Sequence, residues 1–174
     1  RLQKVYKQAQ TGGDKAAKLA YEVLSRYKEA LVQGRNARTV TFETKDEEKV
    51  ARELYLLTSK PVLYVCNVDE ASALSGNQYV EQVRAAIQDE GADLLVVAAK
   101  IESEIAELET YEERQMFLGE IGLEESGVAR LIKAAYALLN LETYFTAGVQ
   151  EVRAWTYTKG SKAPRAAAAI HTDF

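Results

Sequence analysis

The sequence of 174 residues contains one cysteine, one histidine and two prolines. Cys66 alone gives no disulfide framework, and together with a lone His171 it excludes a Cys/His zinc cluster. No apolar run reaches about 18 residues, which excludes a membrane-spanning helix, and no signal-peptide pattern opens the chain. With 47% hydrophobic and 28% charged residues, we expect a globular, cytoplasmic protein that does not insert into membranes.

Charge is distributed unevenly, although the net charge is only −4. Residues 1–45 hold ten Lys or Arg and four Asp or Glu, a net charge of +6, whereas residues 46–174 carry −10. A basic segment favours a polyanionic partner such as RNA, because Lys and Arg neutralise phosphates. A solvated helical surface explains the same charges equally well. The candidate nucleic-acid contacts are Lys4, Lys7, Lys15, Lys18, Arg35 and Arg38, together with Arg153 near Trp155.

The first part of the chain predicts an antiparallel helical hairpin. Apolar residues at helical spacing indicate helices over residues 1–10 and 14–33, joined by Thr11-Gly12-Gly13. Asp14 is the expected N-cap of the second helix and Gly34 its expected end. The chain starts within a helical pattern and stops directly after an Ala-rich helix, so we expect a fragment of a longer protein.

The middle of the chain predicts an α/β arrangement. The expected helices cover residues 46–58, 78–90, 110–121 and 126–139, and the expected strands cover residues 62–66 and 94–98. The strand–helix–strand order makes the two strands parallel, and their nearly continuous apolar residues predict burial on both faces. Two parallel strands cannot form a complete sheet, so further strands are expected from outside this sequence.

The last part predicts a small α+β module. Alternating residues indicate strands over 141–146 and 149–157 with a turn at Ala147-Gly148, and Pro164 opens a helix that runs to about His171.

Polar residues follow both parallel strands, at the edge where ligands bind in open α/β sheets. The first strand is followed by Asn67-Val68-Asp69-Glu70 and the second by Ala98-Ala99-Lys100. Each group alone is typical of a turn. Together they are similar to the base-recognition loops of P-loop NTPases, which read Asn-Lys-x-Asp and Ser-Ala-Lys.

The differences from those loops favour adenine over guanine. A carboxylate accepts the paired N–H donors of guanine, but here Glu70 is one methylene longer than the usual Asp, and Val68 stands in place of Lys. Asn67 carries both a donor and an acceptor, which suits N6 and N7 of adenine. Val68 would present its backbone and an apolar flank to the ring, Ala99 would contribute its backbone, and the Lys100 stem would pack on the base.

These loops, with Leu138–Gly148, Val152–Thr156, Ile170–Phe174 and Gly12–Lys15, resemble the YchF / Obg-like ATPase family across essentially the whole chain. The resemblance implies a partial Ras-like parallel sheet with an inserted helical hairpin, followed by the start of a β-grasp (TGS) module. It also implies binding and slow hydrolysis of ATP in preference to GTP, with Mg²⁺, and association with ribosomes. The expected domains are a hairpin (1–45), the C-terminal part of the nucleotide-binding domain (46–140) and the N-terminal part of the TGS domain (141–174).

The sequence contains no Gly-x-x-x-x-Gly-Lys-[Ser/Thr] run, so nothing in it is expected to hold phosphates or Mg²⁺. We therefore expect the chain alone to be inactive and to retain no cofactor, with no catalytic residue and no metal ligand assigned. The alternative function is an RNA- or ribosome-binding module without DNA sequence specificity, and a helical scaffold is a third possibility. We expect His171 and Cys66 to be structural. A solvated helix face is expected for Glu102, Glu104, Glu107, Glu109, Glu112 and Glu113.

Overall fold

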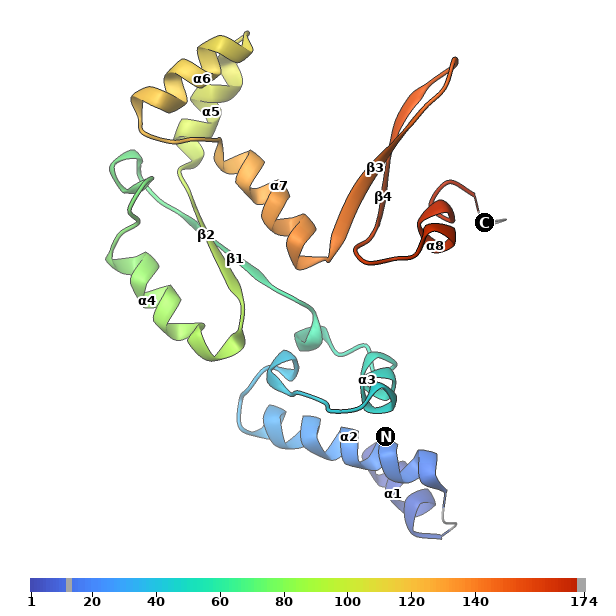
Figure 1. Ribbon diagram of the computed structural model, residues 1–174. Coiled ribbons are helices and arrows are strands. Elements are labelled where there is room, and N and C mark those ends of the chain that lie inside the picture. Colours follow the sequence, from blue (N-terminus) through green and yellow to red (C-terminus); the bar gives the residue numbers. More distant parts are fainter. Residues whose placement is uncertain (12–13, 172–174) are drawn as a thin grey trace. The chain divides into compact units, whose positions relative to one another are not determined.

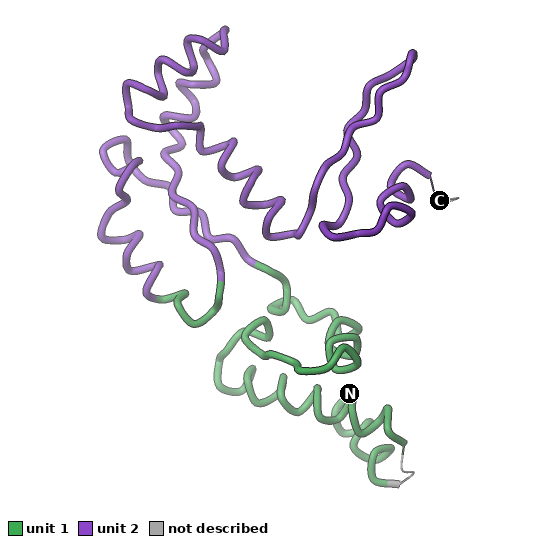
Figure 2. The backbone as a smooth tube through the Cα atoms, viewed as in Figure 1, with its two compact units in different colours: residues 1–61, 86–91 green, residues 62–85, 92–174 purple. Residues whose placement is uncertain are grey.

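The computed structural model describes residues 1–11 and 14–171 (Figure 1). They form two compact units, Arg1–Pro61 with Ala86–Gly91 and Val62–Ala85 with Ala92–Phe174 (Figure 2). The predicted glycine turn at Gly12-Gly13 and the end of the motif Ile170–Phe174 lie outside the described residues.

A helical hairpin opens the first unit, as predicted. Helix α1 (Leu2–Thr11) packs along α2 (Lys15–Val32), and the rings of Tyr6 and Tyr21 are 5.3 Å apart. Asp14 caps α2, because its carboxylate accepts hydrogen bonds from the first-turn N–H groups of Ala16 and Ala17.

Helix α3 (Lys45–Arg52) packs against α2 and is shorter than the predicted helix over residues 46–58. The longer helix was wrong, because Tyr55 has a left-handed backbone (φ 49°) that ends helical geometry before the 3₁₀ turn η2 (Leu57–Ser59). Four buried residues form the core of this unit: Val23, Tyr27, Ala37 and Ala51.

The N-terminus of α3 has a capping box. Thr44 Oγ1 accepts from the N–H of Glu47, and Glu47 Oε2 accepts from the N–H of Thr44 at 2.9 Å. The other oxygen, Oε1, lies 3.1 Å from the guanidinium of Arg26. The hydrogen bond from the Thr44 backbone is the largest influence that lowers the pKa of Glu47 below its ordinary value of 4.5.

We expect Glu47→Gln to lower stability at neutral pH and to lose less stability than the parent on acidification. A carboxylate with a lowered pKa in the folded state contributes fully above pH 4.5, its ordinary value, and that contribution disappears as the pH falls through the lower, folded value. Urea unfolding at a series of pH values from 7 to 3 measures the difference. A gap between parent and variant that stays constant over this range contradicts the assignment.

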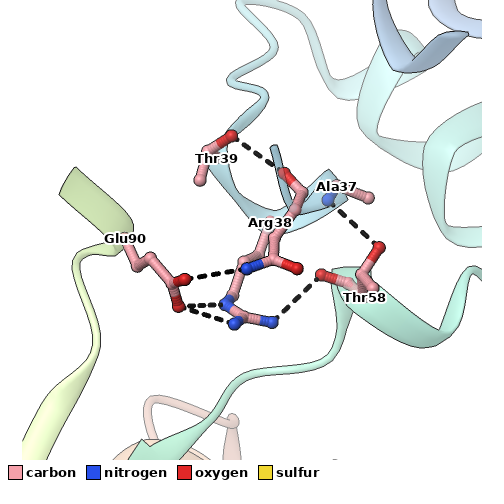
Figure 3. A network of polar contacts seen from close by, with 6 residues as sticks. Ala37, Arg38, Thr39, Thr58 and Glu90 are labelled. Atoms are coloured by element: carbon pink, nitrogen blue, oxygen red, sulfur yellow. Dashed lines mark hydrogen bonds and ion pairs between the residues drawn. The ribbon is translucent and has the colours of Figure 1, made fainter. Parts of the chain in front are cut away.

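Residues 86–91 join the first unit through an ion pair (Figure 3). Arg38, in the 3₁₀ turn η1 (Ala37–Thr39), lies 2.6 Å from Glu90 of η4 (Gln88–Glu90), with only 14% and 19% of the two side chains exposed. Asn36 also donates to Glu90, and Arg38 donates to the carbonyl of Thr58. The pair and its hydrogen bonds thus connect three 3₁₀ turns: η1, η2 and η4.

In the second unit, β1 (Leu63–Asn67) and β2 (Asp93–Val97) are parallel, as predicted, and Asn67 is in register with Val97. Helix α4 (Gln78–Ala86) connects them and ends earlier than predicted, where η4 begins. Burial of the strands on both faces was wrong: Val65 is 49% exposed, because β1 pairs only with β2 among the residues the structure describes.

Three helices follow β2: α5 (Ala99–Glu107), α6 (Tyr111–Glu120) and α7 (Gly127–Leu138). A small core lies directly beneath the strand ends and contains Ala73, Ala98, Ile101, Ile105 and Leu118. The acidic residues 102–113 do not share one helix, because α5 ends at Glu107 and α6 begins only at Tyr111.

The predicted C-terminal hairpin consists of β3 (Leu141–Ala147) and β4 (Val152–Thr158), which are antiparallel. Its loop is longer than predicted, because β4 begins three residues after Val149. The short helix α8 (Ala163–Ala167) ends before His171 and accepts a hydrogen bond from Tyr144 at the carbonyl of Ala166. The mixed α/β class is confirmed.

Candidate nucleotide-base site

Asn67 stands at the carboxyl end of β1 and reaches the segment that follows the neighbouring strand. Its Oδ1 accepts a hydrogen bond from the N–H of Ala99 at 3.0 Å. Ala98 occupies the N-cap position of α5 and has no side-chain oxygen, so Asn67 supplies the cap from another strand. The structure therefore brings Asn67 and Ala99 together, and the Nδ2 donor of the exposed Asn67 side chain takes no part in this bond.

Glu70 and Lys100 also meet at this edge. Lys100 Nζ lies 2.5 Å from Glu70 Oε1 and 3.8 Å from Glu104 on the next turn of α5. The hydrogen bond that Lys100 donates to Glu70 is the main cause that raises the pKa of Lys100, so the ammonium stays charged at neutral pH. The two side chains are 72% and 48% exposed, which keeps the pair accessible to a ligand and makes its contribution to stability small.

Val68 has a more structural place than predicted. Its side chain packs against the core that contains Ala98 and Ile101, and its N–H donates to the carbonyl of Val97 at 2.9 Å. Only the remaining surface of this partly buried side chain is available to contact the purine ring of a nucleotide.

One residue of this edge was assigned wrongly. Glu102, predicted to lie on a solvated helix face, accepts hydrogen bonds from the N–H groups of Gly127 and Val128, at 2.6 and 3.1 Å. No local pattern reveals this contact, because the partners are 25 and 26 residues away in the chain. The sequence feature nearest to this contact is the Ser126-Gly127 pair, which marks the start of α7 but does not indicate that Glu102 binds there.

The fold agrees with comparisons to known proteins. The chain is 56% identical over 163 residues, 92% of its length, to the ribosome-binding ATPase YchF of Bacillus subtilis. It is 37% identical over 177 residues to Obg-like ATPase 1 of Rattus norvegicus. The structure of the Schizosaccharomyces pombe YchF GTPase matches 99% of the chain with a TM-score of 0.82 and 30% identity. The chain belongs to the YchF / Obg-like ATPase family.

Only part of a YchF protein is represented. The chain spans about half the length of the curated relatives it matches, 44% of the Bacillus and rat proteins and 47% of the S. pombe chain. A family model named YchF-GTPase_C, described as a protein of unknown function (DUF933), matches residues 141–174.

The basic residues fall in both units of this YchF-family chain. Lys4, Lys7, Lys15 and Lys18 lie exposed on α1 and α2. Arg35 is exposed and donates to Gln33, whereas the side chain of Arg38 is largely buried in its ion pair with Glu90. The prediction that Arg38 contacts a nucleic acid does not fit this place, because Glu90 already neutralises its charge. In the second unit, the guanidinium of Arg153 lies 4.2 Å from the ring centre of Trp155.

Over residues 1–11 and 14–171, no group of three or more His, Cys, Asp or Glu could hold a metal ion, so we assign none of them to Mg²⁺. Cys66 lies partly buried within β1. In the same part of the chain, no helix has the length and apolar character needed to cross a membrane.

Proposed function

We propose that this chain supplies the base-recognition loops of a cytoplasmic, ribosome-associated ATPase that binds and slowly hydrolyses ATP in preference to GTP. The relatives named ribosome-binding ATPase YchF support an association with the ribosome and an ATPase activity. We further propose that residues 1–45 form an inserted hairpin, residues 46–140 the later part of the nucleotide-binding domain, and residues 141–174 the beginning of a TGS domain.

The hydrogen bond between Asn67 and Ala99 is the observation that carries the proposal. With Oδ1 engaged by Ala99, the Nδ2 group of Asn67 is left to donate to N7 of a purine. The remaining lone pair of Oδ1 accepts from the N6 amino group of adenine. Lys100 extends its aliphatic stem along the ring, and Glu70 neutralises its ammonium from the opposite strand end.

We expect Asn67→Asp in the complete protein to weaken ATP binding by about 1–3 kcal/mol, since the base loses a donor and faces a carboxylate instead. The aspartate still accepts from the N–H of Ala99, so the cap of α5 is kept. Asn67→Ala removes both contacts and is expected to weaken binding at least as much. Calorimetric titration with ATP measures the dissociation constants.

The matched control is Asn77→Asp. Asn77 Oδ1 accepts from the N–H groups of Tyr79 and Val80, so it caps α4 as Asn67 caps α5, but at a different place in the same unit. ATP affinity is expected to be unchanged in this variant. An Asn67→Asp protein that binds ATP as tightly as the parent would remove Asn67 from the base site.

A second function, RNA binding in the ribosome, is favoured by the exposed lysines of the hairpin. Lys4, Lys7, Lys15 and Lys18 stand on a segment of net charge +6. Arg153 stacked on Trp155 offers a further cationic and aromatic surface. Contacts of this kind weaken steeply with salt, so RNA affinity that is equal at low and high salt argues against them.

A further inference from the structure

Glu102 joins the first turn of α5 to the first turn of α7. Its two carboxylate oxygens accept from the N–H groups of Gly127 and Val128, and Ser126 Oγ accepts from Ala129 at 3.1 Å. A helix N-terminus carries unpaired N–H groups and a partial positive charge, so a carboxylate from a neighbouring helix is a strong partner. Glu102 thereby fixes the orientation of α5 relative to α7.

Two further features support this junction. Gly127 is buried, and a Cβ atom there would lie 2.8 Å from Glu102 Oε1 and 3.0 Å from Val97 Cγ1, so a larger residue at this position would displace the carboxylate. Arg130, one turn along α7, donates from Nη2 to the carbonyl of Val96 at 2.9 Å. The start of α7 is therefore attached both to α5 and to the end of β2.

The segment 98–100 lies between these attachments. It leaves β2 just after the carbonyl that Arg130 binds, and it enters α5 just before Glu102. Ala98 has no capping side chain, so the path of this segment is set by Asn67 on one side and by the axis of α5 on the other.

We propose that Glu102 is a positioning residue for the nucleotide base: it orients Ala99 and Lys100 by anchoring α5 to α7. This inference rests on the proposed function of the same edge. In Glu102→Gln, the amide has only one oxygen to accept with, and its NH₂ group faces a backbone N–H. The first turn of α5 then shifts, and the contacts of the base loosen while the phosphate contacts, made elsewhere in the complete protein, are retained.

The test compares ATP with inorganic tripolyphosphate, which carries the phosphates without the base. In the complete protein, Glu102→Gln is expected to weaken ATP binding about tenfold, which is about 1.4 kcal/mol, and to leave tripolyphosphate affinity unchanged, because only the contacts to the base depend on the position of the first turn of α5. Gly127→Ala, which displaces the carboxylate without removing it, is expected to act in the same way. Glu107→Gln, an exposed acid on the same helix, is the matched control and should change neither affinity.

The outcomes separate the inference from the proposed function. If the parent binds ATP no more tightly than tripolyphosphate, the base site itself is wrong. If the parent binds ATP more tightly than tripolyphosphate and Glu102→Gln keeps the same ratio of the two dissociation constants, Glu102 does not position the base. Equal losses of affinity for ATP and for tripolyphosphate also overturn the inference, because a general loss of structure would weaken both.

Discussion

Arg38→Ala is expected to lower the free energy of unfolding by about 3 kcal/mol, because it leaves the largely buried carboxylate of Glu90 without its counter-ion. Arg38 donates to Glu90 from both Nε and Nη2, and it also satisfies the carbonyl of Thr58. The substitution thus removes contacts among three 3₁₀ turns at once. Urea unfolding followed by far-UV circular dichroism measures the loss.

An exposed ion pair in the same unit provides the control. Arg52 lies 3.0 Å from Glu48 on α3, and their side chains are 80% and 48% exposed. Arg52→Ala is expected to change stability by at most about 0.5 kcal/mol, since solvent screens such pairs. In a double-mutant cycle, Arg38→Ala with Glu90→Ala should cost clearly less than the sum of the two single variants. Additive losses would show that the pair is not coupled.

The meeting of Asn67 with Ala99 was predictable, because it follows from topology. A strand–helix–strand unit forces parallel strands, and the carboxyl ends of neighbouring parallel strands share one edge of the sheet. Five paired residues on each strand place Asn67 opposite Val97, two residues before Ala99. Helix N-termini were equally predictable where the cap is local, as for Asp14 and for Thr44 with its capping box.

Contacts between distant residues were not predictable in this way. Glu90 is 52 residues from Arg38, and neither periodicity nor capping rules relate two such positions. The same holds for Glu102 with Gly127. The end of α3 was missed for a different reason: Tyr55 adopts a left-handed backbone, which sequence rules reserve mainly for glycine and asparagine. Its side chain is 88% exposed, so burial does not explain the conformation.

Val68→Lys combined with Glu70→Asp is expected to move the purine preference of the complete protein toward GTP, by about 10- to 100-fold in the ratio of dissociation constants. Guanine presents N1–H and an amino group side by side, and one carboxylate accepts both. Glu70 is engaged by Lys100 at 2.5 Å, whereas an aspartate is one methylene shorter and withdraws from that contact. Titration of each variant with ATP and GTP gives the ratio.

The two single variants identify which side chain carries the change. Glu70→Asp alone is expected to produce most of it, because the freed carboxylate makes the new hydrogen bonds. Val68→Lys alone should mainly cost stability, because the valine packs against the core beneath the loop and a lysine must redirect its stem to solvent. An ATP-to-GTP ratio that is unchanged in the double variant would mean that neither position 68 nor position 70 faces the Watson–Crick edge of the base. Adenine preference would then rest on Asn67 and the backbone of residues 98–100.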